Sequence, residues 1–101
     1  MALRIITTEV FEKWFDKLKD IKAIAIINAH IDRMIAGNMG NIKSVGNGIC
    51  EKKIYYGTGY RLYFYKKNNE WIILLCGGNK STQQRDIEAA KKMLKELKNN
   101  G

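Results

Sequence analysis

YRLYFYKKNNEWIILLCGG, at residues 60–78, predicts a β-hairpin at the centre of the fold. Residues 60–66 are rich in aromatic side chains, and Asn68 and Asn69 tolerate the left-handed backbone that a tight turn requires. Residues 71–76 are apolar throughout, which is typical of a central strand covered on both faces. We therefore expect two adjacent antiparallel strands, of which the second is the main core strand.

The residues before this hairpin predict a strand and two helices. Residues 2–6 favour a short strand, and Thr7 and Thr8 offer a hydroxyl cap for an amphipathic helix that follows. Asp20 is suited to cap a second helix, whose apolar stripe ends at the Gly- and Asn-rich run of residues 37–41. The two helices are expected to form an antiparallel hairpin.

Strands and a last helix complete the predicted order. Residues 42–45 and 49–56 are short, rich in β-branched and aromatic residues, and bounded by glycines. Ser81 and Gln84 have the spacing of a capping box, which places a final helix after them. The sequence thus predicts one α+β domain over residues 1–101, with helices on one face of an antiparallel meander and the other face partly open.

The composition indicates a small basic domain. The 101 residues carry 18 Lys and Arg against 10 Asp and Glu, a net charge of +8, and residues 51–101 hold most of the excess. One His and two Cys without a Cys-x-x-Cys pair argue against a zinc site, so we expect no metal and no cofactor. The apolar segment at the amino terminus is too short for a secretory signal, and no membrane segment is expected. These features favour a cytoplasmic protein with free thiols.

Basic and aromatic side chains alternate on the predicted sheet. Alternation places Arg61, Tyr63 and Tyr65 on one face of their strand, and Lys53 and Tyr55 alternate in the same way. A face with cations and phenol rings can hold phosphates by charge and bases by stacking, as a single-stranded nucleic-acid site does. The alternative is an ordinary solvated face of an antiparallel sheet.

The segment GGNKST, at residues 77–82, connects the core strand to the last helix. Free amides at a helix amino terminus attract anions, and Lys80 adds a positive charge, so this segment could cradle a phosphate. Its spacing is not that of a P-loop, which argues against nucleoside triphosphate hydrolysis. The alternative is a plain turn followed by a helix cap.

Four further residues are candidates for chemistry but have simpler interpretations. His30 falls beside the apolar stripe of the second helix and is expected to pack there. Cys50 and Cys76 lie in strands and are expected to pack as small apolar residues. Glu51, a carboxylate in a basic strand, is expected to pair with Lys53 or Arg61, or to accept a proton.

Four motifs follow one another along the chain: EKKI (residues 51–54), YGTGYRLYF (56–64), LLCGGNKSTQ (74–83) and DIEAA (86–90). Together they resemble the RelE/ParE superfamily of bacterial toxins, and in particular the HigB-like addiction module killer proteins. The resemblance covers almost the whole chain. It implies the toxin of a type II toxin-antitoxin module, which cleaves messenger RNA on the ribosome without a metal through attack of a 2′-hydroxyl on the scissile phosphate.

The resemblance also implies site residues and partners. Arg61 would stabilise the phosphate, Lys53 would lie near the 2′-hydroxyl, and Lys80 would hold the phosphate or the leaving oxygen. A lysine becomes a base only where nearby positive charge and burial lower its pKa, which a cluster of basic residues here could do. The expected partners are an antitoxin, the ribosome and messenger RNA. The residues expected to bind RNA are Lys52, Tyr55, Tyr63, Tyr65, Ser81 and Gln84.

Two other functions stay open at this point. A ParE-like inhibitor of DNA gyrase would share the fold and lack the cationic cluster, so Arg61 and Lys80 argue against it. A non-catalytic RNA-binding module would need the same positive face, and it would lose affinity rather than turnover when a cation is removed.

Overall fold

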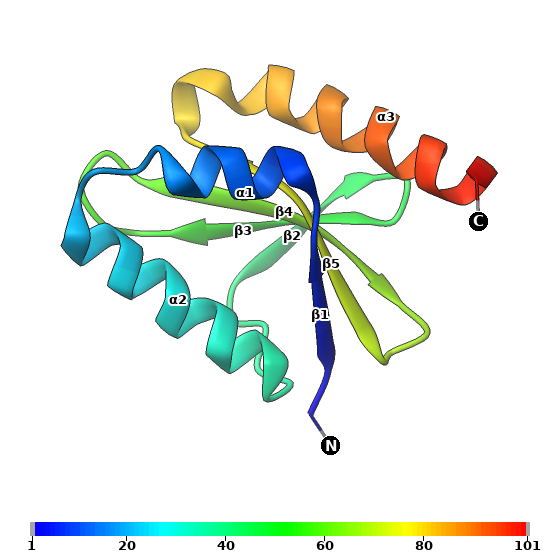
Figure 1. Cartoon of the computed structure of the whole chain (residues 1–101), viewed down its shortest axis with the longest axis horizontal. Coiled ribbons are helices and arrows are strands. Elements are labelled where there is room, and N and C mark those ends of the chain that lie inside the picture. Colours follow the sequence, from blue (N-terminus) through cyan, green and yellow to red (C-terminus); the bar gives the residue numbers. More distant parts are fainter. Residues whose placement is uncertain (1, 101) are drawn as a thin grey trace.

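A computed structural model describes residues 2–100 of the chain. The predicted domain limits, Met1 and Gly101, lie outside the described residues. Figure 1 shows the elements in the predicted order, with one additional short 3₁₀ turn before the last helix. They are β1 (Arg4–Thr7), α1 (Glu9–Asp16), α2 (Ile21–Ile35), β2 (Ile42–Gly46), β3 (Ile49–Ile54), β4 (Tyr60–Lys67), β5 (Trp71–Gly78), η1 (Lys80–Thr82) and α3 (Gln83–Asn100).

The five strands form one sheet in the order β1-β5-β4-β3-β2. Strands β2 to β5 are an antiparallel meander, and β1 joins the edge of β5 in parallel orientation. The turn between β4 and β5 contains Asn68 and Asn69 at φ 53° and 56°, the left-handed conformation that their side chains tolerate. The α+β class and the meander are confirmed, and β5 is an interior strand paired with β1 and β4.

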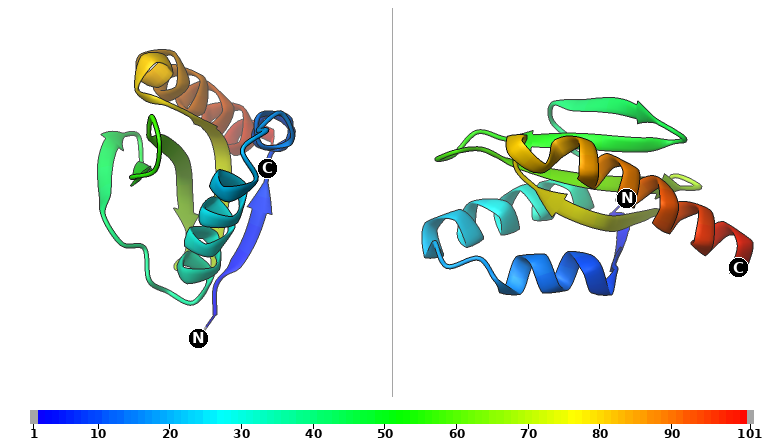
Figure 2. Two further views of the ribbon diagram at one scale, coloured as in Figure 1. Left: turned by 90° about the vertical axis from the view of Figure 1, so that its left-hand side faces the viewer. Right: turned by 90° about the horizontal axis from the view of Figure 1, so that it is seen from above.

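Helices pack on both faces of the sheet, which differs from the expectation that they all lie on one face. Helices α1 and α2 cover one face and α3 covers part of the other (Figure 2). The first core lies under α1 and α2 and includes Phe11, Ile27 and Phe64. The second core lies under α3 and includes Leu75 and Leu94. The last helix carries an apolar stripe of its own, which must be buried against a sheet face, and the first face is already occupied.

The helix caps agree with the sequence in two of three places. The hydroxyl of Thr8 accepts a hydrogen bond from the amide of Phe11, and the carboxylate of Asp20 accepts from the amides at the start of α2. The predicted Ser81 capping box is wrong. Asn79 and Thr82 form the capping box of η1 instead, because a 3₁₀ turn precedes α3.

Gly77 and Gly78 belong to β5 rather than to the loop that follows, where the sequence placed them. Their lack of a side chain has a steric reason on each face of the sheet. A Cβ at Gly77 would collide with the ring of Trp14, and a Cβ at Gly78 would collide with the carboxylate of Asp86. Both glycines therefore let a helix approach the sheet closely.

We expect Gly77→Ala to lower the free energy of unfolding by about 1–3 kcal/mol, because overpacking forces the Trp14 ring out of its place. Urea unfolding followed by fluorescence measures the change. Lys66→Ala, an exposed position on β4, is the control and should change the stability by less than about 0.5 kcal/mol. Equal stability of Gly77→Ala and the natural protein would show that the ring is not packed against the strand.

Candidate active site

Three cations that are distant in the sequence line one pocket. Lys53 comes from β3, Arg61 from β4, and Lys80 from the turn η1 that follows β5. The pocket has a volume of about 340 Å³. Among the residues that the structure describes, every formally charged side chain lining it is positive. The remaining lining residues are Ile54, Tyr55, Thr58, Gly59 and Tyr60.

The register of the sheet produces this arrangement. Lys53 and Arg61 are direct partners across the antiparallel pair of β3 and β4, and Gly78 is the partner of Arg61 on β5. Like charges directly opposite each other on a sheet are destabilising, so this pair is not explained by stability. An anion bound between the two side chains would remove the repulsion. The pocket is therefore suited to a phosphate group.

The buried carboxylate of Glu51 lies beneath the cationic pocket and contacts Arg61. Glu51 is 1% exposed, and its Oε2 lies 3.6 Å from the Nε of Arg61. The same oxygen accepts hydrogen bonds from the hydroxyl of Tyr63 at 2.9 Å and from the side-chain amide of Gln83 at 2.8 Å. The expected pairing of Glu51 with Arg61 is confirmed. Because three side chains converge on one oxygen, the Arg61 side chain is held at the pocket wall.

Tyr63 lies inside the protein, contrary to the expectation that it stacks on a base. Its ring is fully buried because α3 covers this face of the sheet. Burial and the hydrogen bond to Glu51 raise the pKa of Tyr63 well above its ordinary value of 10.0. Tyr63 therefore acts as a neutral hydrogen-bond donor to Glu51 and offers no surface to RNA.

Two further residues that the sequence assigned to RNA binding lie away from the pocket. Tyr65 is four residues along β4 from Arg61, a distance of about 13 Å, and Lys98 of α3 lies over its ring with Nζ 4.9 Å from the centroid. Gln84 is exposed and donates to Glu88 on α3. The neighbouring Gln83 reaches the site instead, because it faces Glu51.

The segment after β5 does not present the free amides that the sequence suggested. The side-chain oxygen of Asn79 already accepts hydrogen bonds from the amides of Ser81 at 2.9 Å and Thr82 at 3.2 Å. Ser81 and Lys80 line a shallow pocket with Thr58, which adjoins the cationic pocket through Thr58 and Lys80. The group that this turn could offer to an anion is therefore the ammonium of Lys80.

Tyr55 and Lys52 lie on either side of the expected cluster. Tyr55 is 80% exposed at the rim of the cationic pocket, where a phenol ring is available for stacking. Lys52 points to the opposite face of the sheet, toward α2, because neighbouring residues in a strand alternate. Burial and the charge of Arg33 lower the pKa of Lys52. The basic cluster is thus divided between two faces.

Sequence reasoning missed Tyr60, Thr58 and Gln83 as residues of the site. Tyr60 lies at the start of β4 beside Arg61, and Thr58 lies in the turn before it, so their proximity follows once the strand limits are known. The role of Gln83 could not be predicted, because the extra 3₁₀ turn before α3 decides which of the two glutamines faces the sheet. Within residues 2–100, no three His, Cys, Asp or Glu side chains are grouped as a metal site requires.

We expect Cys76 to resist alkylation in the folded protein. Burial raises the pKa of the Cys76 thiol to about 12 from an ordinary 9.0, so its thiolate fraction at pH 8 falls about a thousandfold. Cys50 is half-buried, with a pKa raised to a smaller extent, and is the internal control. Mass spectrometry after iodoacetamide treatment, with and without urea, measures both. Equal labelling of the two thiols in the folded protein would contradict this packing.

The fold is that of RelE toxins. One similar solved structure is the Escherichia coli toxin RelE, a double mutant in the free state, with a TM-score of 0.68, 15% identity, and coverage of 92% of this chain and 97% of that one. Another is the toxin-antitoxin complex RelBE2 from Mycobacterium tuberculosis, with a TM-score of 0.61, 14% identity, and coverage of 79% of this chain and 100% of that one. The RelE-like α+β architecture is therefore confirmed.

A relative by sequence is an uncharacterized protein of Haemophilus influenzae (strain ATCC 51907 / DSM 11121 / KW20 / Rd). It is 50% identical over 97 residues, which are 96% of this chain and 98% of the relative. The chain belongs to the same family as that protein. No family model matches the chain. In the part of the chain that the structure describes, no helix combines the length and apolar character needed to cross a membrane.

Proposed function

We propose that this protein is the toxin of a type II toxin-antitoxin module and cleaves messenger RNA on the ribosome. The observation that carries the proposal is the convergence of Lys53, Arg61 and Lys80 on one pocket of a RelE-like fold. The HigB-like subtype suggested by the sequence motifs is part of the same proposal. Because the two solved toxins are only 14% and 15% identical to this chain, the proposed activity is argued from the pocket and its chemistry.

The chemistry that suits this pocket needs cations rather than a metal ion. The 2′-hydroxyl of one nucleotide gives its proton to a base, and its oxygen attacks the adjacent phosphorus. The bond to the 5′-oxygen of the next nucleotide breaks, and that oxygen takes up a proton from an acid, which leaves a cyclic phosphate and a 5′-hydroxyl. Negative charge gathers on the phosphate as the pentacoordinate centre forms, and fixed cations stabilise it. In our proposal Arg61 holds the non-bridging oxygens, Lys53 lies near the 2′-hydroxyl, and Lys80 lies near the leaving oxygen.

Stacking at the rim would orient the substrate. Tyr55 presents an exposed ring at the edge of the pocket, and a base stacked on an aromatic ring contributes about 1–3 kcal/mol. Holding the reacting oxygen and phosphorus in line is itself a large part of the barrier reduction in such reactions. Tyr55 therefore replaces Tyr63 as the proposed stacking residue.

An antitoxin is the second proposed partner. The RelBE2 structure contains a toxin with its antitoxin, and this chain has the fold of its toxin. A net charge of +8 favours an acidic partner, because complementary charge accelerates association and selects partners. Such a partner would inhibit the protein by covering the cationic pocket or by preventing entry into the ribosome.

Purified protein tests the activity directly. It is added to messenger RNA on translating ribosomes, to the same RNA without ribosomes, and to a supercoiling reaction of DNA gyrase, and RNA ends are read by primer extension. We expect cuts within the translated frame on ribosomes only, and far fewer with Lys80→Ala. Lys67→Ala, which removes one exposed charge at the other end of β4, is the matched control and should cut normally.

Two results would contradict the proposal. Intact RNA together with inhibited supercoiling would indicate a gyrase inhibitor. RNA binding without cleavage, with affinity falling uniformly for each lysine removed, would indicate a binding module.

A further inference from the structure

A second basic pocket lies on the α2 side of the sheet, next to the cationic pocket. It has a volume of about 380 Å³ and is formed by α2, the loop of residues 37–41 and β3. Lys53 and Tyr55 line both pockets, so the two are adjacent. Its other lining residues are His30, Arg33, Asn38, Gly40, Asn41 and Lys52.

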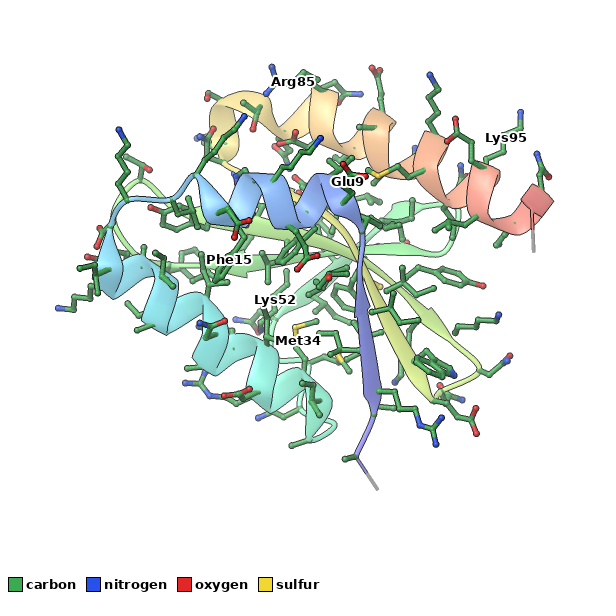
Figure 3. The ribbon with its side chains drawn as sticks, in the orientation of Figure 1. Glu9, Phe15, Met34, Lys52, Arg85 and Lys95 are labelled. Carbon is green, nitrogen blue, oxygen red and sulfur yellow. The ribbon has the colours of Figure 1, made fainter. Side chains whose placement is uncertain are left out.

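Lys52 is the feature of this pocket that calls for an explanation. Its side chain lies between α2 and the sheet (Figure 3) and is 3% exposed. Its ammonium donates a hydrogen bond to the carbonyl of Met39 at 2.7 Å, and no carboxylate within residues 2–100 forms an ion pair with it. A buried charge without a counter-ion is costly, so a structure that keeps one favours the binding of an anion.

The neighbours of Lys52 add donors and positive charge rather than a counter-ion. Arg33 projects from α2 into the same pocket, and the buried Nδ1 of His30 has no hydrogen-bond partner among the described residues. Gly40 has φ 68°, and a Cβ there would come 2.7 Å from the Lys52 ammonium. The loop thus approaches the ammonium closely.

We propose that this pocket binds a phosphate group, namely a backbone phosphate of the RNA strand next to the phosphate held by Lys53, Arg61 and Lys80. The sharing of Lys53 and Tyr55 lets one strand pass from the first pocket to the second. Arg33 and Lys52 hold the phosphate by charge, and the His30 ring donates to it when protonated. This role rests on the proposed function, since it names where the same RNA is held.

His30 is the single histidine of the chain and reports on the pocket without any assay of activity. Burial and the charges of Lys52 and Arg33 lower the pKa of His30. Lys53 of β3 and Tyr55, just after that strand, also line the pocket. A bound phosphate offsets this repulsion, so the pKa of His30 should rise when phosphate binds. Its imidazole resonances measure this in titrations with inorganic phosphate, against chloride at equal ionic strength.

Two variants and one control test whether phosphate binds in this pocket. Arg33→Ala changes an exposed helix position, and Lys52→Met removes the buried charge at similar volume. Each should weaken phosphate binding about tenfold or more, which is the loss of one charged hydrogen bond. Arg85→Ala, an exposed arginine on α3 directed away from this pocket (Figure 3), should leave binding unchanged.

Binding of an RNA oligonucleotide with 2′-O-methyl groups, which cannot be cut, tests the source of the phosphate. Reduced affinity for it in Arg33→Ala and Lys52→Met, together with the His30 response, is the expected result. A His30 spectrum that phosphate leaves unchanged would overturn the inference, whether or not the protein cuts RNA. A His30 response with unaltered oligonucleotide affinity in both variants would overturn the assignment to RNA. Absence of cleavage with both binding effects present would contradict only the proposed function.

Discussion

Arg61→Ala should lower the rate of RNA cleavage by about 10²–10³-fold while the affinity for uncut RNA changes little. The guanidinium lines the pocket beside Lys53 and Lys80, where charge on the phosphate increases in the transition state. Removing one fixed donor from such a position costs about 2.7–4 kcal/mol of transition-state stabilisation. Single-turnover cleavage on programmed ribosomes measures the rate, and a binding assay with uncut RNA measures the affinity.

Controls separate chemistry from folding in this experiment. Arg61 also pairs with buried Glu51, so the melting temperature of the variant is measured alongside the rate. Lys80→Ala changes an exposed residue of the same pocket and should slow cleavage without loss of stability. Unchanged rates in both variants would remove the pocket from the mechanism. A loss of affinity equal to the loss of rate would indicate a binding role instead.

Glu51→Ala should lower the free energy of unfolding by about 3–5 kcal/mol, the cost of breaking a buried ion pair from one side. The change leaves Arg61 without its counter-ion, and it leaves Tyr63 and Gln83 without their acceptor. A loss of this size is a large fraction of the stability of a small domain. Urea unfolding measures it.

The exposed Glu70→Ala in the turn between β4 and β5 is the matched control and should change the stability by less than about 0.5 kcal/mol. Glu51→Gln keeps an acceptor for Tyr63 and should lose less than Glu51→Ala. A small loss in Glu51→Ala would contradict the view that this carboxylate holds Arg61 in place.

The fold could be predicted because local signals agree with the tertiary structure. Thr8 and Asp20 cap the helices where their side chains suggest, and Asn68 and Asn69 form the hairpin turn. The exception is the second sheet face. Strand alternation tells which residues share a face, and it does not tell whether a helix covers that face. For this reason Tyr63 was expected to be exposed and is buried.

The cations of the candidate site could be predicted from the sequence. The side chains around Glu51 that hold Arg61 in place could not. Lys53 and Arg61 meet because they are partners in the antiparallel pair of β3 and β4. The predicted ends of these two strands already place the two residues nearly opposite each other. The convergence of Tyr63, Gln83 and Arg61 on Glu51 depends on the phase of α3, which the 3₁₀ turn at Lys80–Thr82 shifts. The pocket at Lys52 depends on the path of the loop after α2, which residue types do not specify.

Controlled expression in a bacterium, with growth followed alongside 5′-end mapping of transcripts, tests the central claim most directly. The natural protein is compared with Arg61→Ala at equal soluble amounts. We predict arrested growth with new cuts inside translated frames for the natural protein, and neither effect for the variant. Arrest with intact transcripts, or no arrest at confirmed soluble expression, would contradict the assignment of this pocket to RNA cleavage.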